Sequence, residues 1–470
     1  MNDDNAARRV IQELRAHVTA AAPGSKLPSV RDLMARHHVS PVTVQRVLRE
    51  LAVEGLVETR PGRGSYVAQR QVAVTEVADL SWQSVAMGER RAGEEALPEL
   101  LAMPRPEAIP LSAGYPETAL QPVTALGQAL SRAARRPQAW SRGVVEGRDD
   151  LRAWFAREAG GALRPGDMVV CPGGQSGLGT VLRALCVPGD TLLVESPTYL
   201  GTIAAARTFG LKVIGVPADA DGVRPDLLAQ AFQRTGARVF YCQPTFANPH
   251  GAVLSATRRA EVLGAVRAAG AFLLEDDWAR DLALDGEAPT PLVAQDPHGH
   301  VVYLRSLTKS GAPGLRVAAI GARGVAGARI RTARVADDFF VSGPLQEAAL
   351  EFVASPAWPR HLRSLRAGLA ARRDALLTAL ARHLPELRPA VVPKGGLHVW
   401  VRLPDGVDDV ALTTAAAAHG VVVFPGRPWY PAEPPGPHLR LTYGAAGPEV
   451  LAEGIRRLAA AFATLGRTSG

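Results

Sequence analysis

The first 68 residues have the hydrophobic pattern of three helices and two short strands. Apolar positions recur at near-helical intervals in three stretches, residues 8–21, 28–39 and 41–54. Ser40 followed by Pro41 is typical of a helix start, because serine caps free backbone amides and proline suits the first turn. Residues 56–59 and 65–68 alternate like strands around a turn rich in glycine. Residues 1–68 are therefore predicted to form a winged helix-turn-helix, an α+β fold.

Beyond residue 68 the pattern first weakens and then changes to alternating strands and helices. Residues 69–107 show little periodicity and are predicted to be a linker. Short apolar runs predict strands at 167–171, 191–194, 212–216, 238–242, 271–275 and 301–304. Helical spacing between them predicts helices at 177–186, 200–209, 225–232 and 258–269. This alternation predicts an α/β domain with a mostly parallel, helix-covered sheet over about residues 108–355.

The last stretch of the chain has a third pattern. It begins with a long helical segment rich in arginine and leucine, residues 360–384. Two strand-like runs, GGLHVWVRL and HLRLTYG, follow, and a helix at 448–465 closes the chain. This order predicts a smaller C-terminal α+β domain over about residues 360–465, so the chain is expected to be multidomain, with 108–465 as its larger part.

Composition narrows the class of protein. With 47% apolar and 21% charged residues, the chain is typical of a globular protein and not of a disordered one. Neither a secretory signal nor a membrane-spanning run is evident, so a cytoplasmic protein without membrane contact is expected. Its three cysteines have no paired spacing and predict neither disulfides nor a metal site. The formal charge of +8 is compatible with a polyanionic partner.

Four motifs in the first domain carry a family resemblance. LPSVRDL (27–33), VSPVTVQRVLREL (39–51), EGLV (54–57) and GRGSYV (62–67) resemble the GntR-type DNA-binding domain. The resemblance implies contact with double-stranded operator DNA through Arg31, Ser40, Thr43, Gln45, Arg46, Arg63 and Gly64. Pro41 stands where the family often has arginine, which shifts the expected base readout towards Gln45 and Arg46. A helical hairpin used for protein contacts is the alternative.

Lys309 is the sharpest candidate for chemistry. The chain has only four lysines, and this one lies in YLRSLTKSGAPGLRVAAIG (303–321), just after an apolar run. A lysine amine at a strand end can form a Schiff base with an aldehyde. Ser306 and Arg316 could hold a phosphate dianion beside it. The alternative is that Lys309 is an ordinary solvated lysine.

This motif and several others, in order, resemble the fold-type I, class I/II aminotransferases that use pyridoxal 5′-phosphate (PLP). In LLEDDWARDL (273–282) the resemblance implies that Asp276 pairs with the pyridine nitrogen of PLP. Trp278 stands where the family usually has tyrosine; its indole N–H can donate a hydrogen bond to the phenolate oxygen but cannot accept one or share a proton. Asn248, in the NPxG segment, is implied to donate to the same oxygen, and Tyr199 to stack on the ring.

Three further positions follow from the same resemblance. CPGGQSGL (171–178) opens a helix, so Gly174, Gln175 and Ser176 are expected to meet the phosphate at the positive helix end. Arg440 lies where the family's arginine pairs with a substrate carboxylate. Arg142 replaces a tyrosine that reaches the phosphate of the neighbouring subunit, and it is expected to act there through its charge.

Together, a GntR-like domain and an aminotransferase-like domain resemble the MocR arrangement of transcriptional regulators. The resemblance implies a homodimer with the PLP site at the subunit interface. It also implies that PLP is bound to Lys309 and that the signal is PLP itself or an amino compound. Two alternatives remain: an active PLP-dependent aminotransferase with an appended DNA-binding domain, which Trp278 argues against, and an inert domain that only dimerises.

Overall fold

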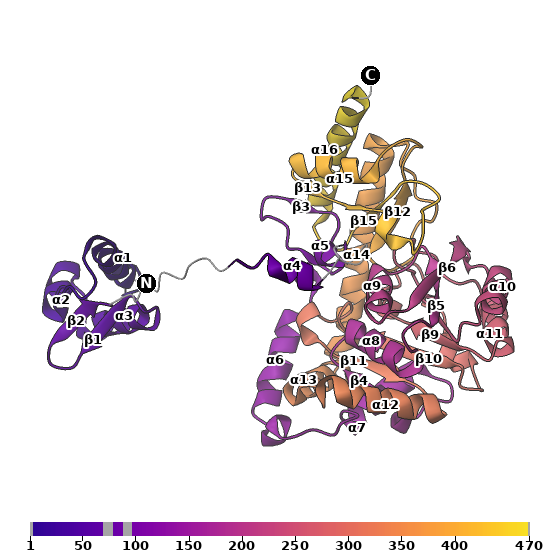
Figure 1. Cartoon of the computed structure of the whole chain (residues 1–470), viewed down its shortest axis with the longest axis horizontal. Helices are drawn as coiled ribbons and strands as arrows, with labels where there is room; N and C mark the ends of the chain where they lie inside the picture. The colour runs from indigo at the N-terminus through magenta and orange to yellow at the C-terminus, as the bar shows by residue number, and fades with distance from the viewer. Residues whose placement is uncertain (1–2, 69–78, 88–95, 469–470) are drawn as a thin grey trace. The chain divides into compact units, whose positions relative to one another are not determined.

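Two compact units make up the chain in the computed structural model, Met1–Arg90 and Arg91–Gly470. The structure describes residues 3–68, 79–87 and 96–468 (Figure 1). Residues 69–78 and 88–95, which belong to the stretch predicted as a linker, lie outside the described residues.

The first unit is a winged helix-turn-helix, which confirms the predicted fold. Its elements are α1 (Asp3–Ala20), α2 (Val30–His37), α3 (Pro41–Val53), β1 (Val57–Arg60) and β2 (Gly64–Val67). The two strands form an antiparallel hairpin, the wing, with Val57 opposite Val67. Leu14, Leu33 and Val47, one from each helix, are fully buried in a single core. That core fixes α3 and the wing in one rigid body.

Serine caps define where α2 and α3 begin. Ser29 and Asp32 form a reciprocal capping box at the start of α2. At the start of α3, the Ser40 hydroxyl accepts the Thr43 backbone N–H at 3.2 Å, and Pro41 occupies the first turn. Capping satisfies amides that have no partner inside the helix. The predicted start of the third helix is therefore explained by its own sequence.

The second unit is built on an eight-stranded mixed sheet. Its strands are β4 (Met168–Cys171), β5 (Thr191–Ser196), β6 (Lys212–Asp219), β7 (Gly222–Val223), β8 (Val239–Cys242), β9 (Phe272–Asp276), β10 (Val301–Ser306) and β11 (Ala318–Gly321). They lie in the order β4-β11-β10-β9-β8-β5-β6-β7. The five central strands, β10 to β6 in this order, pair in parallel, as predicted. β11, which is antiparallel to β10 and β4, was not among the predicted strands.

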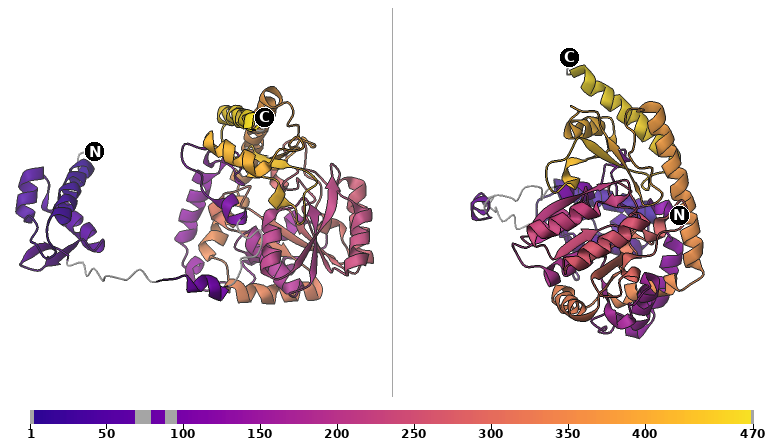
Figure 2. Two further views of the ribbon diagram at one scale, coloured as in Figure 1. Left: turned by 45° about the horizontal axis from the view of Figure 1, so that its top comes forward. Right: turned by 90° about the vertical axis from the view of Figure 1, so that its right-hand side faces the viewer.

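Helices cover both faces of this sheet (Figure 2). They are α6 (Val123–Ala134), α7 (Asp149–Ala159), α8 (Gly174–Leu185), α9 (Leu200–Thr208), α10 (Pro225–Thr235), α11 (Ala256–Ala268), α12 (Gly324–Asp338) and α13 (Gly343–Val353). Along β4, Met168 and Val170 pack into the core with α7, α10 and α11, whereas Val169 and Cys171 pack with α8 and α12. Strand side chains alternate between faces, so such a doubly covered strand is apolar throughout.

The smaller C-terminal domain packs on the long helix α14 (Ala357–His383). Its other elements are β12 (His398–Arg402), α15 (Asp409–Ala418), β13 (Val421–Val422), β14 (Phe424–Pro425), β15 (His438–Thr442) and α16 (Pro448–Thr468). Strands β12, β15 and β14 form an antiparallel sheet. β13 pairs in parallel with β3 (Ile109–Pro110), so the segment that precedes the large domain is joined to the small one.

Two short helices lie within the stretch predicted as a linker, α4 (Trp82–Met87) and α5 (Ala96–Leu101). α5 belongs to the second unit and contacts α9. Its Leu100 packs against buried side chains that include Leu200 and Trp429. The end of the linker stretch is thus part of the folded body.

Within the described residues, no helix is long and apolar enough to span a bilayer, and no cluster of side chains could hold a metal ion. The three cysteines are free thiols, with Cys171 and Cys242 buried. Burial raises the pKa of Cys171 to about 12, which keeps this thiol protonated and unreactive.

The cap of α3 generates a stability prediction. Ser40→Ala removes the acceptor of the Thr43 amide, so the α3 amides should lose about 1 kcal/mol of protection against hydrogen exchange. Ser40→Asn retains a capping oxygen and should keep nearly full protection. Equal protection in the wild type and in Ser40→Ala would show that the cap contributes nothing.

Candidate cofactor pocket and nucleic-acid interface

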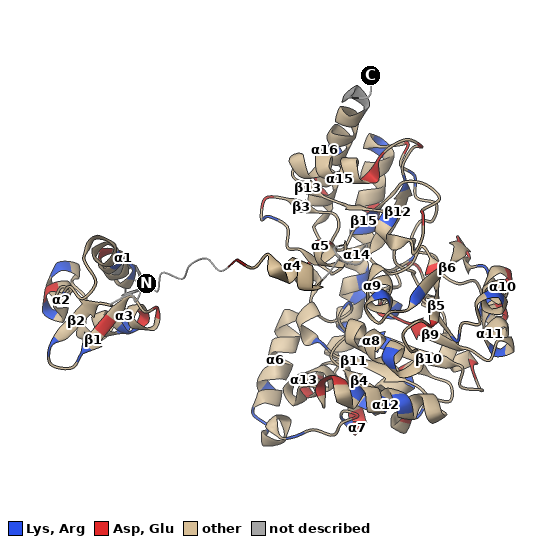
Figure 3. Cartoon of the chain, in the orientation of Figure 1, with Lys and Arg blue, Asp and Glu red and all other residues tan. Residues whose placement is uncertain are grey.

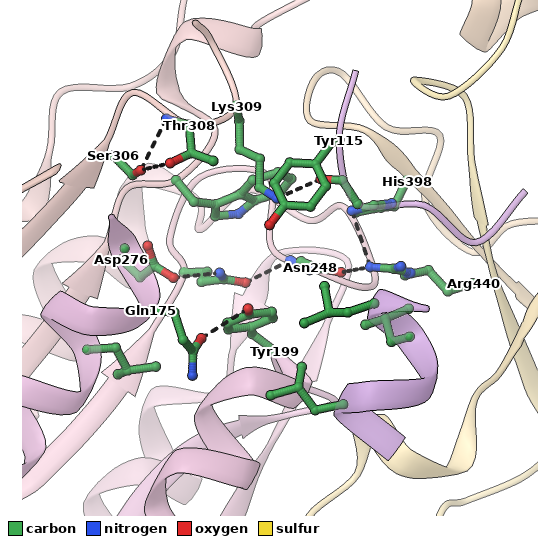
Figure 4. Close-up of a pocket in the computed structure, with 18 of the residues that line it drawn as sticks. Tyr115, Gln175, Tyr199, Asn248, Asp276, Ser306, Thr308, Lys309, His398 and Arg440 are labelled. Atoms are coloured by element: carbon green, nitrogen blue, oxygen red, sulfur yellow. Dashed lines mark hydrogen bonds between the residues drawn. The ribbon is translucent and has the colours of Figure 1, made fainter. Parts of the chain in front are cut away.

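One pocket gathers most of the residues that the sequence motifs singled out (Figure 4). It lies where β8, β9 and β10 end, at the carboxyl edge of the parallel strands, which is the usual ligand site of such sheets. From the predicted set, its lining contains Gly174, Gln175, Tyr199, Asn248, Asp276, Trp278, Ser306, Lys309, Arg316 and Arg440. Residues as distant in the chain as Gly174 and Arg440 are thereby brought to one site.

Lys309 lies three residues beyond the end of β10, with its amine inside the pocket. Its Nζ donates a hydrogen bond of 2.6 Å to the carbonyl oxygen of Gly114 and lies 3.5 Å from the centroid of the Tyr115 ring. Burial, with the positive charges of Arg440 and Arg316, lowers the pKa of Lys309 to about 7, although Asp276 opposes the shift. A large fraction of this amine is therefore neutral near pH 7, the form that attacks an aldehyde.

Asp276 ends β9 and faces the same space. Its Oδ2 accepts hydrogen bonds from the Tyr241 hydroxyl at 2.6 Å and from Gln243 Nε2 at 2.9 Å. Burial raises the pKa of Asp276 to about 6, against the effect of these two donors. The carboxylate is held in one orientation and lacks a cationic partner in direct contact among the described residues. It is suited to receive a positively charged N–H.

An anion cradle lies at the start of α8. Gly173 has a φ of +99°, and a Cβ there would lie only 2.4 Å from Arg316 Nη2, so glycine is required for the guanidinium to approach the turn. Arg316 Nη2 also donates to the Pro172 carbonyl at 2.8 Å. Ser306 lies beside Gly174, since a Cβ added at Gly174 would lie 3.5 Å from the Cβ of Ser306. The amides of the first helical turn, a guanidinium and a hydroxyl thus face one spot, which suits a phosphate.

Two further donors line the pocket near Asp276. The indole nitrogen of Trp278 is buried and has no hydrogen-bond partner among the described residues. Its ring stacks on His398, with centroids 5.8 Å apart. Asn248 accepts a 3.2 Å hydrogen bond from Arg440 at its side-chain oxygen, which leaves its Nδ2 as a donor. An orphaned buried donor is costly unless a ligand acceptor completes it.

Arg440, on β15, is the most buried cation of the site, with 1% of its surface exposed. It donates to the Ser112 carbonyl and to Asn248, and its guanidinium lies 4.3 Å from the centroid of the Trp429 ring. Burial lowers the pKa of Arg440 to about 9. Its Nε has no partner among the described residues. No carboxylate of the described residues pairs with this charge, so a ligand carboxylate would be strongly favoured.

These residues fit PLP. The indole N–H without a partner would face the phenolate oxygen of that cofactor. The anion cradle would hold its phosphate, and the oriented carboxylate would face its ring nitrogen. Lys309 offers the amine. Two predicted residues do not line the pocket. Ser176 lies on α8 beyond the lining, and Arg142 is exposed after the 3₁₀ helix η2 (Pro137–Trp140).

The pocket also contains residues that the sequence analysis did not identify. They are Leu97, Leu100, Leu101, Gly114, Tyr115, Leu178, Gln243, Thr308 and His398. Gln243 could have been predicted from the sequence, because it directly follows the predicted strand 238–242 and lies in the same segment as Asn248. The leucines of α5 had no such signal, since their segment lacks clear periodicity.

The candidate nucleic-acid interface of the first unit is a groove lined by α3 and the wing. Its lining contains the basic residues Lys26, Arg49, Arg60 and Arg63, together with Gln45 and Gly64. Figure 3 shows that the basic positions of this unit lie on α1 as well as on α2, α3 and the hairpin. Counting residues 1–70 gives 11 Lys and Arg against 7 Asp and Glu, a balance of +4. Such a surface attracts phosphate backbones.

The predicted DNA-facing residues are not all placed alike. Arg31, Gln45, Arg46 and Arg63 are exposed. Thr43 is buried, with 5% exposed, and its hydroxyl lies 2.9 Å from that of Ser40. The Ser40–Thr43 pair therefore serves the helix start in this structure. Lys26, Arg49 and Arg60 are additional candidates that the motifs did not indicate.

Comparisons with known proteins match both units. Residues 107–460 match the model of aminotransferase class I and II, and residues 6–67 match that of bacterial regulatory proteins of the gntR family. The chain is 28% identical to the uncharacterised HTH-type transcriptional regulator YdfD of Bacillus subtilis (strain 168), covering 93% of this chain and 91% of that protein. It is 26% identical to the probable rhizopine catabolism regulatory protein MocR of Rhizobium meliloti, covering 97% and 94%.

The second unit is also similar to a solved structure. LysN, the α-aminoadipate aminotransferase of Thermus thermophilus, was crystallised with N-(5′-phosphopyridoxyl)-L-leucine. It is 28% identical to this chain, with a TM-score of 0.75, and the match covers 83% of this chain and all of LysN. With a gntR-family domain and an aminotransferase class I and II domain in one polypeptide, the chain belongs to the GntR/MocR-type transcriptional regulators.

Proposed function

We propose that this regulator binds PLP covalently at Lys309 and changes its affinity for operator DNA when PLP or an amino compound occupies the pocket. The observation that carries the proposal is the convergence of Lys309, Asp276, Arg316 and Arg440 on one buried site. A lysine with a pKa near 7, an oriented carboxylate and an anion cradle form a set that a structural core does not require.

Each residue has a distinct task in this proposal. When bound, PLP supplies an aldehyde and an electron-withdrawing ring. Arg316, Ser306 and the first turn of α8 hold its phosphate, while Asp276 neutralises the protonated ring nitrogen. Lys309 supplies the neutral amine that attaches the cofactor and releases it when another amine competes. Arg440 binds the carboxylate of that competing amine.

The regulator is proposed to act as a homodimer. Trp140 is 68% exposed directly before the segment that carries Arg142. An exposed tryptophan of this kind suits a protein interface. In the dimer, Arg142 would reach the phosphate cradle of the partner, which accounts for its position outside the pocket of its own chain.

A second candidate function is transamination. The pocket gathers the predicted lysine, carboxylate and arginines, and the fold of the second unit matches that of LysN. Against this, Trp278 replaces the usual tyrosine, and its buried indole can donate to the phenolate oxygen but cannot exchange a proton with it. Sustained turnover with amino donors and 2-oxo acids would support the enzyme; a single partial turnover would support the sensor.

The attachment site can be tested by chemical trapping. Borohydride reduction of the PLP-loaded protein should fix the cofactor mass on the peptide that contains Lys309. Lys212→Ala, at an exposed lysine, should leave this labelling unchanged, whereas Lys309→Ala should abolish it. Peptide mass spectrometry reads the outcome, and a label on Lys26, Lys212 or Lys394 would contradict the assignment.

The depressed pKa of Lys309 predicts a pH dependence. Attachment requires the neutral amine, so its rate should rise with pH, reach half its maximum near pH 7 and level off above that. Arg440→Gln removes a neighbouring positive charge and should move the midpoint upward. Stopped-flow absorbance of PLP binding measures the profile. A midpoint near 10.5, the ordinary lysine value, would show that the amine is not perturbed.

DNA binding can be tested through its salt dependence. Arg31→Ala should weaken operator binding and reduce the slope of log affinity against log salt by about 1, because a phosphate contact releases counterions. Arg157→Ala, at a 69% exposed arginine of the second unit, is the matched control and should leave the slope intact. Fluorescence anisotropy at several salt concentrations gives both slopes. Parallel lines for the wild type and Arg31→Ala would place Arg31 away from DNA.

A further inference from the structure

One wall of the cofactor pocket comes from the stretch that the sequence analysis treated as a linker. Leu97, Leu100 and Leu101 of α5 line the pocket. Their helix is held in place because Ala96 and Leu100 pack on a buried cluster that includes Trp429. Leu101 remains 55% exposed. The wall is therefore apolar. One side of it packs against the buried cluster around Trp429, and Leu101 leaves part of it uncovered.

The proposed function assigns a partner to each positive side chain of the pocket, and none of these partners is the side chain of the ligand. Arg316 faces the phosphate cradle, Lys309 the aldehyde, and Arg440 the carboxylate common to amino acids. No further lysine or arginine is among the described lining residues. His398 lines the pocket but remains neutral, because burial and the nearby Arg440 hold its pKa well below the ordinary value. A second carboxylate on the ligand would be desolvated without a counter-charge from this chain.

From this arrangement we infer that the effector is an amino acid with one carboxylate and a sizeable apolar side chain, which packs on the three leucines of α5. The inference rests on the proposed function and specifies its ligand class. The other lining residues include the Tyr115 ring, against which Lys309 lies, and the His398 ring, which stacks on Trp278. Covering the leucines removes apolar surface from water, and this favours larger apolar side chains over small or charged ones.

The position of α5 in the chain gives the wall a second role. α5 is the first described helix of the second unit, whose boundary with the DNA-binding unit falls at Arg90. The segment that follows it also reaches the pocket, where Gly114 accepts from Lys309 and Ser112 from Arg440. An apolar ligand would bind better to the state with α5 in place and would therefore stabilise that state.

Ligand titration of the PLP-loaded full-length protein tests the inference. L-leucine, L-phenylalanine, L-alanine and L-glutamate are each titrated while the cofactor absorbance is followed. L-leucine and L-phenylalanine should bind at least about tenfold more tightly than L-alanine, which corresponds to about 1.4 kcal/mol. L-glutamate should be the weakest. In hydrogen exchange, L-leucine should protect the amides of α5, and L-alanine should not.

Variants of the wall separate specificity from general damage. Leu100→Ala should lower the affinity for L-leucine and L-phenylalanine about tenfold and leave that for L-alanine unchanged. Leu80→Ala, at a leucine that is 56% exposed and outside the pocket, is the control and should change nothing. Leu97→Arg supplies a cation and should raise the affinity for L-glutamate relative to L-leucine.

The outcomes distinguish this inference from the function on which it rests. If L-glutamate binds the wild type as tightly as L-leucine, or if Leu100→Ala weakens L-alanine equally, the leucine wall does not select the ligand. If PLP attaches to Lys309 but none of the four amino acids changes its absorbance, the inference fails while the attachment in the proposed function stands. If PLP does not attach, both the inference and the proposed function fail.

Discussion

The pocket of the second unit holds more positive than negative side chains, and the chemistry of the site depends on this imbalance. Lys309, Arg316 and Arg440 line the pocket with Asp276 as the sole carboxylate among the described lining residues. Burial disfavours the charged forms of Lys309 and Arg440 and lowers the pKa of both side chains. Such a site is costly to the folded chain alone and favourable to ligands that bring negative charge. A phosphate and a carboxylate would satisfy the two arginines, and an aldehyde would consume the lysine amine.

The fold creates this imbalance through its topology. Parallel strands place their carboxyl ends at one edge, so Asp276 and Lys309 meet although they follow different strands. The antiparallel β11 then brings Arg316, which precedes it, back to the turn before α8. Arg440 comes from the small domain. The site therefore combines side chains from the large and the small domain of this unit.

The sequence predicted those parts of the molecule that have local signals. The cap at Ser40 and the apolar runs of the central strands indicated the winged helix and the parallel sheet, and both are confirmed. The motif residues around Lys309 were predicted to share a site because they recur in a known order. The positions of His398 and of the α5 leucines in the pocket could not be predicted from the sequence, because contacts between distant segments leave no periodic pattern.

The same contacts explain how one chain can join two functions. α5 lies at the start of the aminotransferase-like unit and lines its pocket, so a ligand in that pocket would be contacted close in the chain to the connection with the winged helix. By linkage, if the state that the ligand favours also differs in operator affinity, ligand and operator must alter each other's affinity by the same factor. This coupling needs no change in the winged helix itself.

The central claim is that occupancy of the Lys309 pocket controls DNA binding. The most direct measurement is the operator affinity of the PLP-free, PLP-loaded and amine-treated protein at one salt concentration, for the wild type and for Lys309→Ala. The account predicts a change of about 5-fold to 150-fold between at least two of the wild-type states, corresponding to about 1–3 kcal/mol, and no change in Lys309→Ala. Identical affinities in all three wild-type states would contradict it.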